Sequence, residues 1–282
     1  MQKTIVLNPD ELDQDPAVGM DLAVELGVTH LEIRTAYGAN ALVLDDGQLR
    51  QVRRLADDRE LTIAALASPL WKWCPADANP GKVDSFGFPT RVAPGERADW
   101  VDRALTVASV LGTSRVRVFS HLRVEDTLTE TLHDDPLLPY ALARAEQEGV
   151  RLLLENEPVC TVARLEPLLD VLGRFPGLGL WLDLGNLHEV GDGTVDAVRT
   201  LAPRTEYVHV KDFLPRPDEG HGDKAFVAPG SGAVPYRELL PVLAQERPGL
   251  LYGLETHVRD EPAVALAKGA AFLHDVLPGD PE

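Results

Sequence analysis

Short runs of apolar residues recur along the chain, and the segments between several of them show apolar positions at a helical spacing. Each run is 4–6 residues long and nearly continuous in apolar character. This pattern is typical of strands that are buried on both faces of a parallel sheet. The eight predicted strands are Thr4–Leu7, His30–Ile33, Leu61–Leu66, Arg115–Phe119, Arg151–Leu154, Leu178–Leu182, Tyr207–Val210 and Leu251–Leu254.

The intervening segments are predicted to be helices. Asp99–Leu111, Leu165–Leu172 and Tyr236–Leu243 place apolar residues three and four apart, which is the period of one helix face. Eight strand–helix alternations in 282 residues favour an α/β fold of the (β/α)8 (TIM) barrel type over an open sheet. We expect a single barrel domain over residues 1–277 and a short frayed tail over residues 278–282.

Three predicted connections are longer than the usual 2–6 residues. All three, Ala67–Gly95, Ser120–Pro136 and Asp212–Val234, follow the carboxyl ends of strands. Barrel enzymes place their chemistry on that face, so we expect at least one connection to act as an active-site lid. The first carries Trp71, Trp73, Phe86 and Phe88.

Ionisable residues stand at the ends of the last four predicted strands. Glu155 and Glu157 follow the fifth strand, Asp183 the sixth, His209 lies in the seventh and Glu255 follows the eighth. The strand ends converge on one rim, where three carboxylates would repel one another unless a cation intervenes. One imidazole and three carboxylates suit one divalent ion such as Mn²⁺, Mg²⁺, Co²⁺ or Zn²⁺. Strand alternation alone leaves both Glu155 and Glu157 open as the fifth-strand ligand.

The same alternation brings further polar groups towards this rim. Lys211 shares a side with His209, and His257 shares a side with Glu255. The predicted substrate contacts are Arg34, Trp71, His121, Asn186, His188 and His257. Such groups suit a polyhydroxylated substrate that carries an acidic group.

The composition of the chain disfavours several classes of function. The chain has 27 basic and 45 acidic residues, a net charge of −18, which disfavours nucleic-acid binding because phosphates are held by Lys and Arg. No apolar run approaches the roughly 20 residues of a membrane span, and the first apolar stretch is too short for a secretory signal. The two cysteines, Cys74 and Cys160, form no metal or redox motif. We expect reduced thiols in a cytoplasmic protein.

Several motifs resemble those of the sugar phosphate isomerase/epimerase superfamily, the xylose-isomerase-like barrels. They are Glu155-Asn156, Asp183-Leu-Gly-Asn186, His209-Val-Lys211-Asp212, Pro229-Gly-Ser-Gly232 and Leu254-Glu255-Thr-His257. The resemblance spans essentially the whole chain and is strongest from residue 150 to residue 258. It implies that Glu155, Asp183, His209 and Glu255 are metal ligands. Many relatives carry His where this chain has Asn186, with His188 two residues further on, so the substrate is left open.

The resemblance implies a metal-dependent isomerase or epimerase of a sugar or sugar phosphate. Glu155 and Glu255 would act as acid and base through a metal-stabilised enediolate, with Lys211 or His257 stabilising oxygen charge. The alternative is a dehydratase of the inosose or dehydroshikimate type, in which His121, His257 or Lys211 helps a hydroxyl to leave. Less favoured are an endonuclease IV-like hydrolase and a non-catalytic barrel subunit. The expected partner is a small sugar or polyol, with no nucleic acid and no membrane, and a homo-oligomer is possible.

Overall fold

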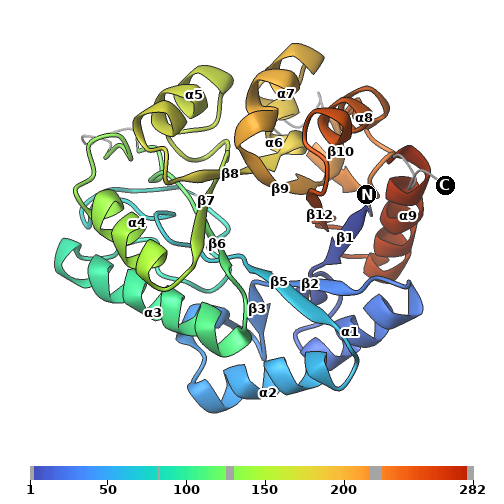
Figure 1. The fold of residues 1–282 in the computed structure, drawn as a ribbon, viewed down its shortest axis with the longest axis horizontal. Coiled ribbons are helices and arrows are strands. Elements are labelled where there is room, and N and C mark those ends of the chain that lie inside the picture. The colour runs from blue at the N-terminus through green and yellow to red at the C-terminus, as the bar shows by residue number, and fades with distance from the viewer. Residues whose placement is uncertain (1–2, 82, 125–129, 216–223, 278–282) are drawn as a thin grey trace.

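Eight parallel strands close into a barrel, and helices surround it (Figure 1). Around the barrel the order is β1-β12-β9-β8-β7-β6-β5-β2, so neighbours in sequence are neighbours in space. The barrel strands are β1 (Thr4–Leu7), β2 (His30–Ile33), β5 (Thr62–Leu66), β6 (Arg115–Val118), β7 (Arg151–Glu155), β8 (Gly179–Asp183), β9 (Thr205–Val210) and β12 (Leu251–Leu254). The predicted α/β barrel fold is confirmed. This computed structural model describes residues 3–277 except 82, 125–129 and 216–223, so the predicted tail at 278–282 lies outside the described residues.

The helices lie on the outside of the barrel, where their apolar faces cover the strands (Figure 1). The three helices predicted by apolar spacing form, and each is extended by two or three residues at one end. The helices of the described chain are α1 (Pro16–Glu25), α2 (Asp46–Asp57), α3 (Arg97–Leu111), α4 (Leu137–Gln147), α5 (Leu165–Arg174), α6 (Leu184–Glu189), α7 (Val195–Leu201), α8 (Tyr236–Glu246) and α9 (Pro262–Val276). No helix in the described ranges is long and apolar enough to cross a membrane.

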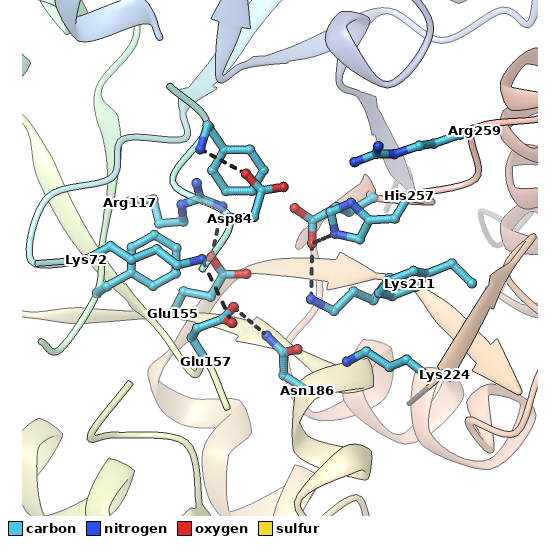
Figure 2. Close-up of a pocket in the computed structure, with 14 residues that line it drawn as sticks. Lys72, Asp84, Arg117, Glu155, Glu157, Asn186, Lys211, Lys224, His257 and Arg259 are labelled. Atoms are coloured by element: carbon cyan, nitrogen blue, oxygen red, sulfur yellow. Dashed lines mark hydrogen bonds and ion pairs between the residues drawn. The ribbon is translucent and has the colours of Figure 1, made fainter. Parts of the chain in front are cut away.

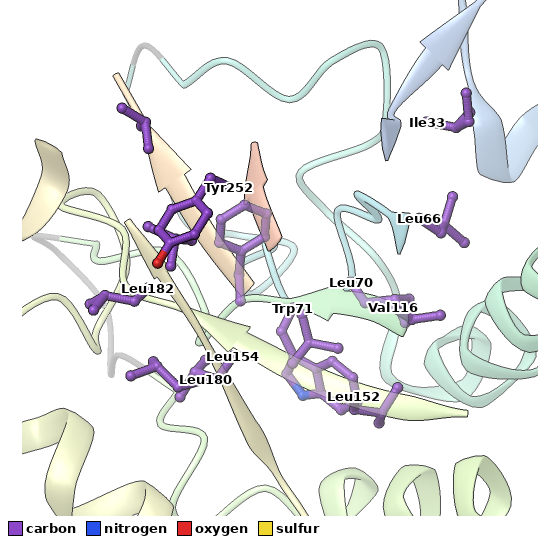
Figure 3. Packing of buried hydrophobic residues seen from close by; sticks show 14 of the residues in the cluster. Ile33, Leu66, Leu70, Trp71, Val116, Leu152, Leu154, Leu180, Leu182 and Tyr252 are labelled. Atoms are coloured by element: carbon purple, nitrogen blue, oxygen red, sulfur yellow. The ribbon is translucent and has the colours of Figure 1, made fainter. Parts of the chain in front are cut away.

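Strand alternation divides the apolar residues into two cores. In β7, Leu152 and Leu154 belong to the outer cluster between strands and helices, part of which Figure 3 shows. Leu153 belongs instead to the small cluster inside the barrel. Inside the barrel, the rings of Trp181 and Tyr207 stack at 3.7 Å between centroids. Because Glu155 is two residues beyond Leu153, it faces inwards at the carboxyl end of the strand.

The long connections carry small structures that the apolar pattern does not predict. The third-strand connection contains a short bridge between Cys74 and Arg91, and its described residues form no full helix or strand before Pro94. After β9 the chain forms an antiparallel pair, β10 (Asp212–Pro215) and β11 (Lys224–Val227). A second pair, β3 (Thr35–Ala36) and β4 (Ala39–Asn40), follows β2. These hairpins bring additional side chains to the carboxyl rim of the barrel.

Candidate metal centre and active site

Four buried ligand-type side chains meet at the carboxyl rim. One ligand atom each from Glu155, Asp183, His209 and Glu255 lies within 4.8 Å of the others. The register of the sheet explains this, because Asp183 pairs with His209 and Gly253 of β12 pairs with His209 from the other side. Within the described chain it is Glu155, and not Glu157, that joins this cluster.

Hydrogen bonds to both its backbone and its side chain hold Asp183 in position. The side chain of Asn156 accepts a hydrogen bond from the Asp183 amide at 2.8 Å and donates to its carbonyl at 2.9 Å. Asp183 also caps helix α6, since its Oδ1 accepts from the amide of Asn186 at 2.7 Å. A Cβ at Gly185 would lie 2.7 Å from the carbonyl oxygen of Lys211, so glycine lets α6 begin this close to β9. The Glu-Asn and Asp-Leu-Gly-Asn motifs therefore hold Asp183 in place.

His209 is held between the cluster and a carboxylate below it. Its Nε2 lies 2.8 Å from Glu32 Oε2, and the same oxygen accepts from the Tyr207 hydroxyl at 2.7 Å. Its Nδ1 faces the cluster, 2.9 Å from Glu155 Oε1 and 3.5 Å from Glu255 Oε2. A metal ion would bind Nδ1 in place of the proton that Nδ1 shares with Glu155 Oε1, with Nε2 still donating to Glu32, which is the arrangement found around metal-bound histidines.

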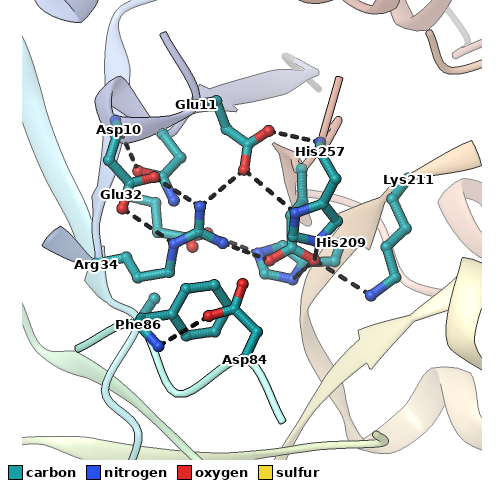
Figure 4. A network of polar contacts seen from close by, with 12 residues as sticks. Asp10, Glu11, Glu32, Arg34, Asp84, Phe86, His209, Lys211 and His257 are labelled. Atoms are coloured by element: carbon teal, nitrogen blue, oxygen red, sulfur yellow. Dashed lines mark hydrogen bonds and ion pairs between the residues drawn. The ribbon is translucent and has the colours of Figure 1, made fainter. Parts of the chain in front are cut away.

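Glu255 pairs with Arg34, Lys211 and His257, whose side chains are labelled in the polar network of Figure 4. Arg34 donates to Glu255 Oε1 at 2.8 Å, and its other donors bind Asp10 and Glu11. Lys211 Nζ lies 3.3 Å from Glu255 Oε2. This oxygen also faces His257 Nε2 at 3.4 Å. Arg34 therefore orients Glu255.

Burial and neighbouring charges set the protonation of the carboxylates. Burial raises the pKa of Asp183 to about 6, against the opposing attraction of Lys211. Burial also acts to raise the pKa of Glu155 and Glu255, but neighbouring cations outweigh it and both pKa values are lowered. The cations are Arg117 beside Glu155 and Lys211 beside Glu255, and His209 acts on both.

The residues present fit a divalent cation. Within the described chain, Asp183 Oδ2 and Glu155 Oε2 are buried and accept no hydrogen bond. Each lies beside a cation instead: Asp183 Oδ2 is 3.0 Å from Lys211 Nζ, and Glu155 Oε2 is 2.9 Å from an Arg117 nitrogen. Three carboxylates and one imidazole form a mixed oxygen–nitrogen donor set of the kind that Mn²⁺, Mg²⁺, Co²⁺ and Zn²⁺ accept.

A cavity of about 240 Å³ opens above this cluster (Figure 2). Two aromatic rings line it, Phe86 from the third-strand connection and Phe119 after β6, and Phe226 of β11 adds a third. Its charged and amide-bearing lining residues are Lys72, Asp84, Arg117, Glu155, Glu157, Asn186, Lys211, Lys224, Glu255, His257 and Arg259. The cavity therefore joins the two glutamates of the cluster to a set of cationic groups.

The predicted substrate contacts divide into two groups. Asn186 and His257 line the cavity, as does Lys211. Arg34 and His188 are not among the described lining residues. Arg34 is occupied by three carboxylates, and the ring of His188 lies 6.1 Å from that of Phe213.

Trp71 and His121 are also absent from the described lining of this cavity. Both are buried, and both bind Asp135 Oδ2 at 2.8 Å. Both have positive φ, 63° and 60°, a backbone conformation that bulky residues rarely adopt. Trp71 and His121 therefore stabilise the loops around the cavity. The spacing of apolar residues could not predict this role, because it carries no information on loop conformation. Of the loop aromatics, Phe86 lines the cavity, while Trp71, Trp73 and Phe88 are buried in the core.

Glu32, Arg117 and Lys72 are among the site residues that the sequence predictions do not include. Glu32 and Arg117 are buried charges inside apolar strands, at positions where alternation turns them into the barrel. A charge within an otherwise apolar strand is a signal that could have identified them. Lys72 lies in a loop, and its only signal in the sequence is the scarcity of lysine in this chain.

A family comparison places this geometry among known barrels. Residues 20–276 match the model of the xylose isomerase-like TIM barrel family. The chain belongs to this family. It is also 27% identical over 165 residues to the uncharacterized protein YihM of Escherichia coli strain K12. That alignment covers 56% of this chain and 49% of YihM, so the chain spans about half the length of this curated relative.

Solved structures share the fold at low sequence identity. A zinc-bound IolI protein superposes with a TM-score of 0.74 and 18% identity, covering 97% of each chain. The probable 3-DHS dehydratase AsbF of Bacillus anthracis gives 0.72 and 16%, covering 97% of this chain and 99% of that one. The D-psicose 3-epimerase of Clostridium cellulolyticum H10 gives 0.68 and 15%, covering 97% and 99%. At these identities the likeness shows the fold alone.

Proposed function

We propose that the protein is a metal-dependent isomerase or epimerase of a sugar or sugar-like substrate, and that it acts by proton transfer between carbon and carboxylate. One observation carries the proposal. Glu155 and Glu255 come from strands separated by β8 and β9, yet both line one cavity and belong to one buried cluster of ligand atoms. Two carboxylates that reach one cavity from different strands can remove a proton from a carbon and return one.

The proposed metal ligands are Glu155, Asp183, His209 and Glu255, and a divalent ion bound there would supply Lewis-acid stabilisation of negative charge on a substrate oxygen. Arg117 and Lys211 lower the pKa values of Glu155 and Glu255 respectively, so each carboxylate is available as a base. Lys211 and His257 line the cavity and can donate to substrate oxygens.

The carboxylates are also held in position. Arg34 binds Glu255 Oε1, and Arg117 pairs with Glu155 Oε2, both at or below 2.9 Å. A base fixed in this way keeps its geometry when the substrate enters, which general acid–base catalysis needs. Phe86 and Phe119 provide apolar surface that excludes water from the cavity.

A dehydratase is the second candidate. It shares the proton-abstraction step, and it then needs an acid for a departing hydroxyl. Lys211 and His257, both within 3.4 Å of Glu255, can fill that role. Product analysis distinguishes the two functions, because a dehydratase releases water and leaves an unsaturated product.

The test follows deuterium from solvent into carbon. Metal-loaded protein is incubated in D₂O with a panel of ketoses, ketose phosphates and keto sugar acids, and each is examined by mass spectrometry and NMR. We expect a single deuterium on the carbon next to the carbonyl. Glu155→Gln and Glu255→Gln should each lower the exchange rate by about 10²-fold or more. Glu25→Gln, at an exposed position on α1, is the matched control and should leave the rate unchanged.

Metal content is measured in every variant, so that loss of a ligand is separated from loss of a base. Turnover without deuterium in the product would contradict the proton-transfer proposal and favour a direct hydride shift. Absence of exchange and of turnover across the whole panel, in fully metal-loaded protein, would favour a non-catalytic barrel.

A further inference from the structure

We infer that the buried ammonium of Lys72 forms the binding site for an oxyanion on the substrate, so that the substrate class is an acidic sugar derivative and not a neutral sugar. This inference rests on the proposed function and narrows its substrate class. It assigns the substrate's oxyanion to the end of the cavity that faces away from Lys211 and His257.

Cationic residues are concentrated in the cavity against the trend of the whole chain. Acidic residues outnumber basic ones by 45 to 27 in the chain. Among the described lining residues, five Lys and Arg side chains face four Asp and Glu side chains. Three of the six lysines of the chain, Lys72, Lys211 and Lys224, lie there. A chain with so few lysines places half of them around one small cavity, which favours an anionic ligand.

Lys72 differs from the other two lysines in having donors to spare. Lys211 pairs with Asp183 and Glu255, and Lys224 pairs with Glu189. The side chain of Lys72 is 5% exposed, and no described residue accepts a hydrogen bond from its Nζ. Its nearest carboxylate, on Glu157, is 3.9 Å away. An ammonium group has three donors, and an anion in the cavity that Lys72 lines would supply charged acceptors for them.

Aromatic rings hold the ammonium without using its donors. Lys72 Nζ lies 4.7 Å from the centre of the Phe119 ring and 5.3 Å from that of Phe86. Cation–π attraction at these distances compensates part of the lost hydration. Lys72 itself lines the cavity, as both phenylalanines do.

The backbone before Lys72 is fixed in a strained conformation. Trp71 has a φ of 63°, and its indole nitrogen donates to Asp135 at 2.8 Å. The Lys72 amide closes a turn onto the carbonyl of Pro69 at 2.9 Å. Strain of this kind persists where surrounding contacts enforce it, and it is common at ligand sites. These contacts direct Lys72 into the cavity.

The position of Lys72 defines the orientation of the substrate. In Figure 2, Lys72 and Arg117 enter the cavity from one side, and Lys211, His257 and Arg259 enter from the other, with the carboxylates between them. An oxyanion at Lys72 would leave the neutral hydroxyl and carbonyl groups of the substrate facing Lys211 and His257. Carboxylate and phosphate share the chemistry that this site recognises, namely acceptor oxygens that carry a negative charge.

The test measures binding and needs no turnover. Three probes share a four-carbon skeleton: erythritol is neutral, erythronate carries a carboxylate and erythritol 4-phosphate carries a phosphate. Calorimetry gives the Kd of each for the wild-type protein, for Lys72→Met and for Lys268→Met at equal metal content. Lys268 is an exposed lysine on α9 and is the matched control.

We expect at least one anionic probe to bind the wild-type protein tenfold or more tightly than erythritol, and the better anion identifies carboxylate or phosphate as the recognised group. Lys72→Met should abolish that preference and leave erythritol binding unchanged, whereas Lys268→Met should retain the preference. An equal preference in Lys72→Met, or none in the wild-type protein, would overturn the inference.

A crystal structure of the wild-type protein with the tighter probe tests the same point without a variant that could misfold. The oxyanion should lie within hydrogen-bond distance of Lys72 Nζ, and an oxyanion bound only at the metal cluster or at Arg259 would refute the site. Lys72-dependent binding without deuterium exchange would reject the proposed function and leave the anion site standing. Deuterium exchange on a substrate, combined with no anion preference or with a preference that Lys72→Met retains, would do the reverse.

Discussion

Glu32 is the buried carboxylate that receives the far nitrogen of His209, and it offers a sharp test of the metal centre. The side chain is 1% exposed, and its Oε2 accepts from both His209 and Tyr207, at 2.8 and 2.7 Å. Glu32→Gln keeps the size and a carbonyl acceptor for His209. It removes the negative charge, which orients the imidazole and raises its basicity as a ligand.

The expected effect can be estimated from these contacts. Loss of a partner to a metal-bound histidine costs about 10–100-fold in metal affinity. That range corresponds to about 1.4–2.7 kcal/mol. The lower end applies if the amide retains the His209 hydrogen bond, and the upper end applies if the amide turns its NH₂ group towards His209. Tyr207→Phe is the matched control, since it removes the other hydrogen bond to Glu32 and keeps the Glu32–His209 contact.

Competition with a chromophoric chelator measures the Kd for Zn²⁺ and Mn²⁺ in metal-stripped protein. Glu32→Gln should weaken both metals by at least tenfold, Tyr207→Phe by less than threefold, and His209→Ala should lose tight binding. Circular dichroism checks that each variant folds. If Glu32→Gln binds metal like the wild-type protein while His209→Ala does not, then Glu32 does not tune the ligand and the reasoning fails.

Two further predictions concern stability and thiol reactivity. A Cβ at Gly232 would lie 2.2 Å from Asp212 Oδ1, so Gly232→Ala should lower the free energy of unfolding in urea by about 1–3 kcal/mol. Gly173→Ala, in an open position on α5, should instead raise it by about 0.5–1 kcal/mol, and the same sign for both would contradict the structure. Burial raises the pKa of Cys160 to about 12 and raises that of Cys74 as well. Both thiols should therefore resist a disulfide reagent at pH 8 in native protein and react in guanidinium chloride, and rapid native reaction of Cys160 would disprove its burial.

The fold could be predicted from the sequence because each strand of a parallel barrel is buried on both faces. Such strands give nearly continuous apolar runs, and Thr4–Leu7, His30–Ile33 and Leu251–Leu254 have the predicted bounds. The fifth and sixth predicted runs end before their first carboxylate, so β7 and β8 each end one residue later than predicted, at Glu155 and Asp183. Both residues are still paired in the sheet, because backbone hydrogen bonding does not depend on the side chain.

The cluster of ligand-type residues could be predicted because the carboxyl ends of barrel strands converge, independently of the conformation of the loops. The choice between Glu155 and Glu157 could not, since alternation turns both towards the same side. In the structure Glu157 lies beyond the last paired residue of β7 and contacts Asn186. The positions of the loop residues could not be predicted from the apolar pattern. Trp71 and Lys72 depend on a left-handed backbone turn at Trp71, and the spacing of apolar residues does not indicate such a turn.

The two glutamates are supported in different ways, and the difference bears on the path of a proton. Glu155 is enclosed by Arg117 and His209, which are themselves buried. Glu255 contacts His257, whose side chain is 22% exposed and lines the cavity. An imidazole beside a carboxylate can pass protons between that carboxylate and water. Glu255 therefore contacts a partly exposed proton relay, whereas the cations that contact Glu155 are buried, although both glutamates line the cavity. A proton held on Glu255 is expected to exchange with water faster than one held on Glu155, so the two faces of the cavity are chemically distinct although both carry a glutamate.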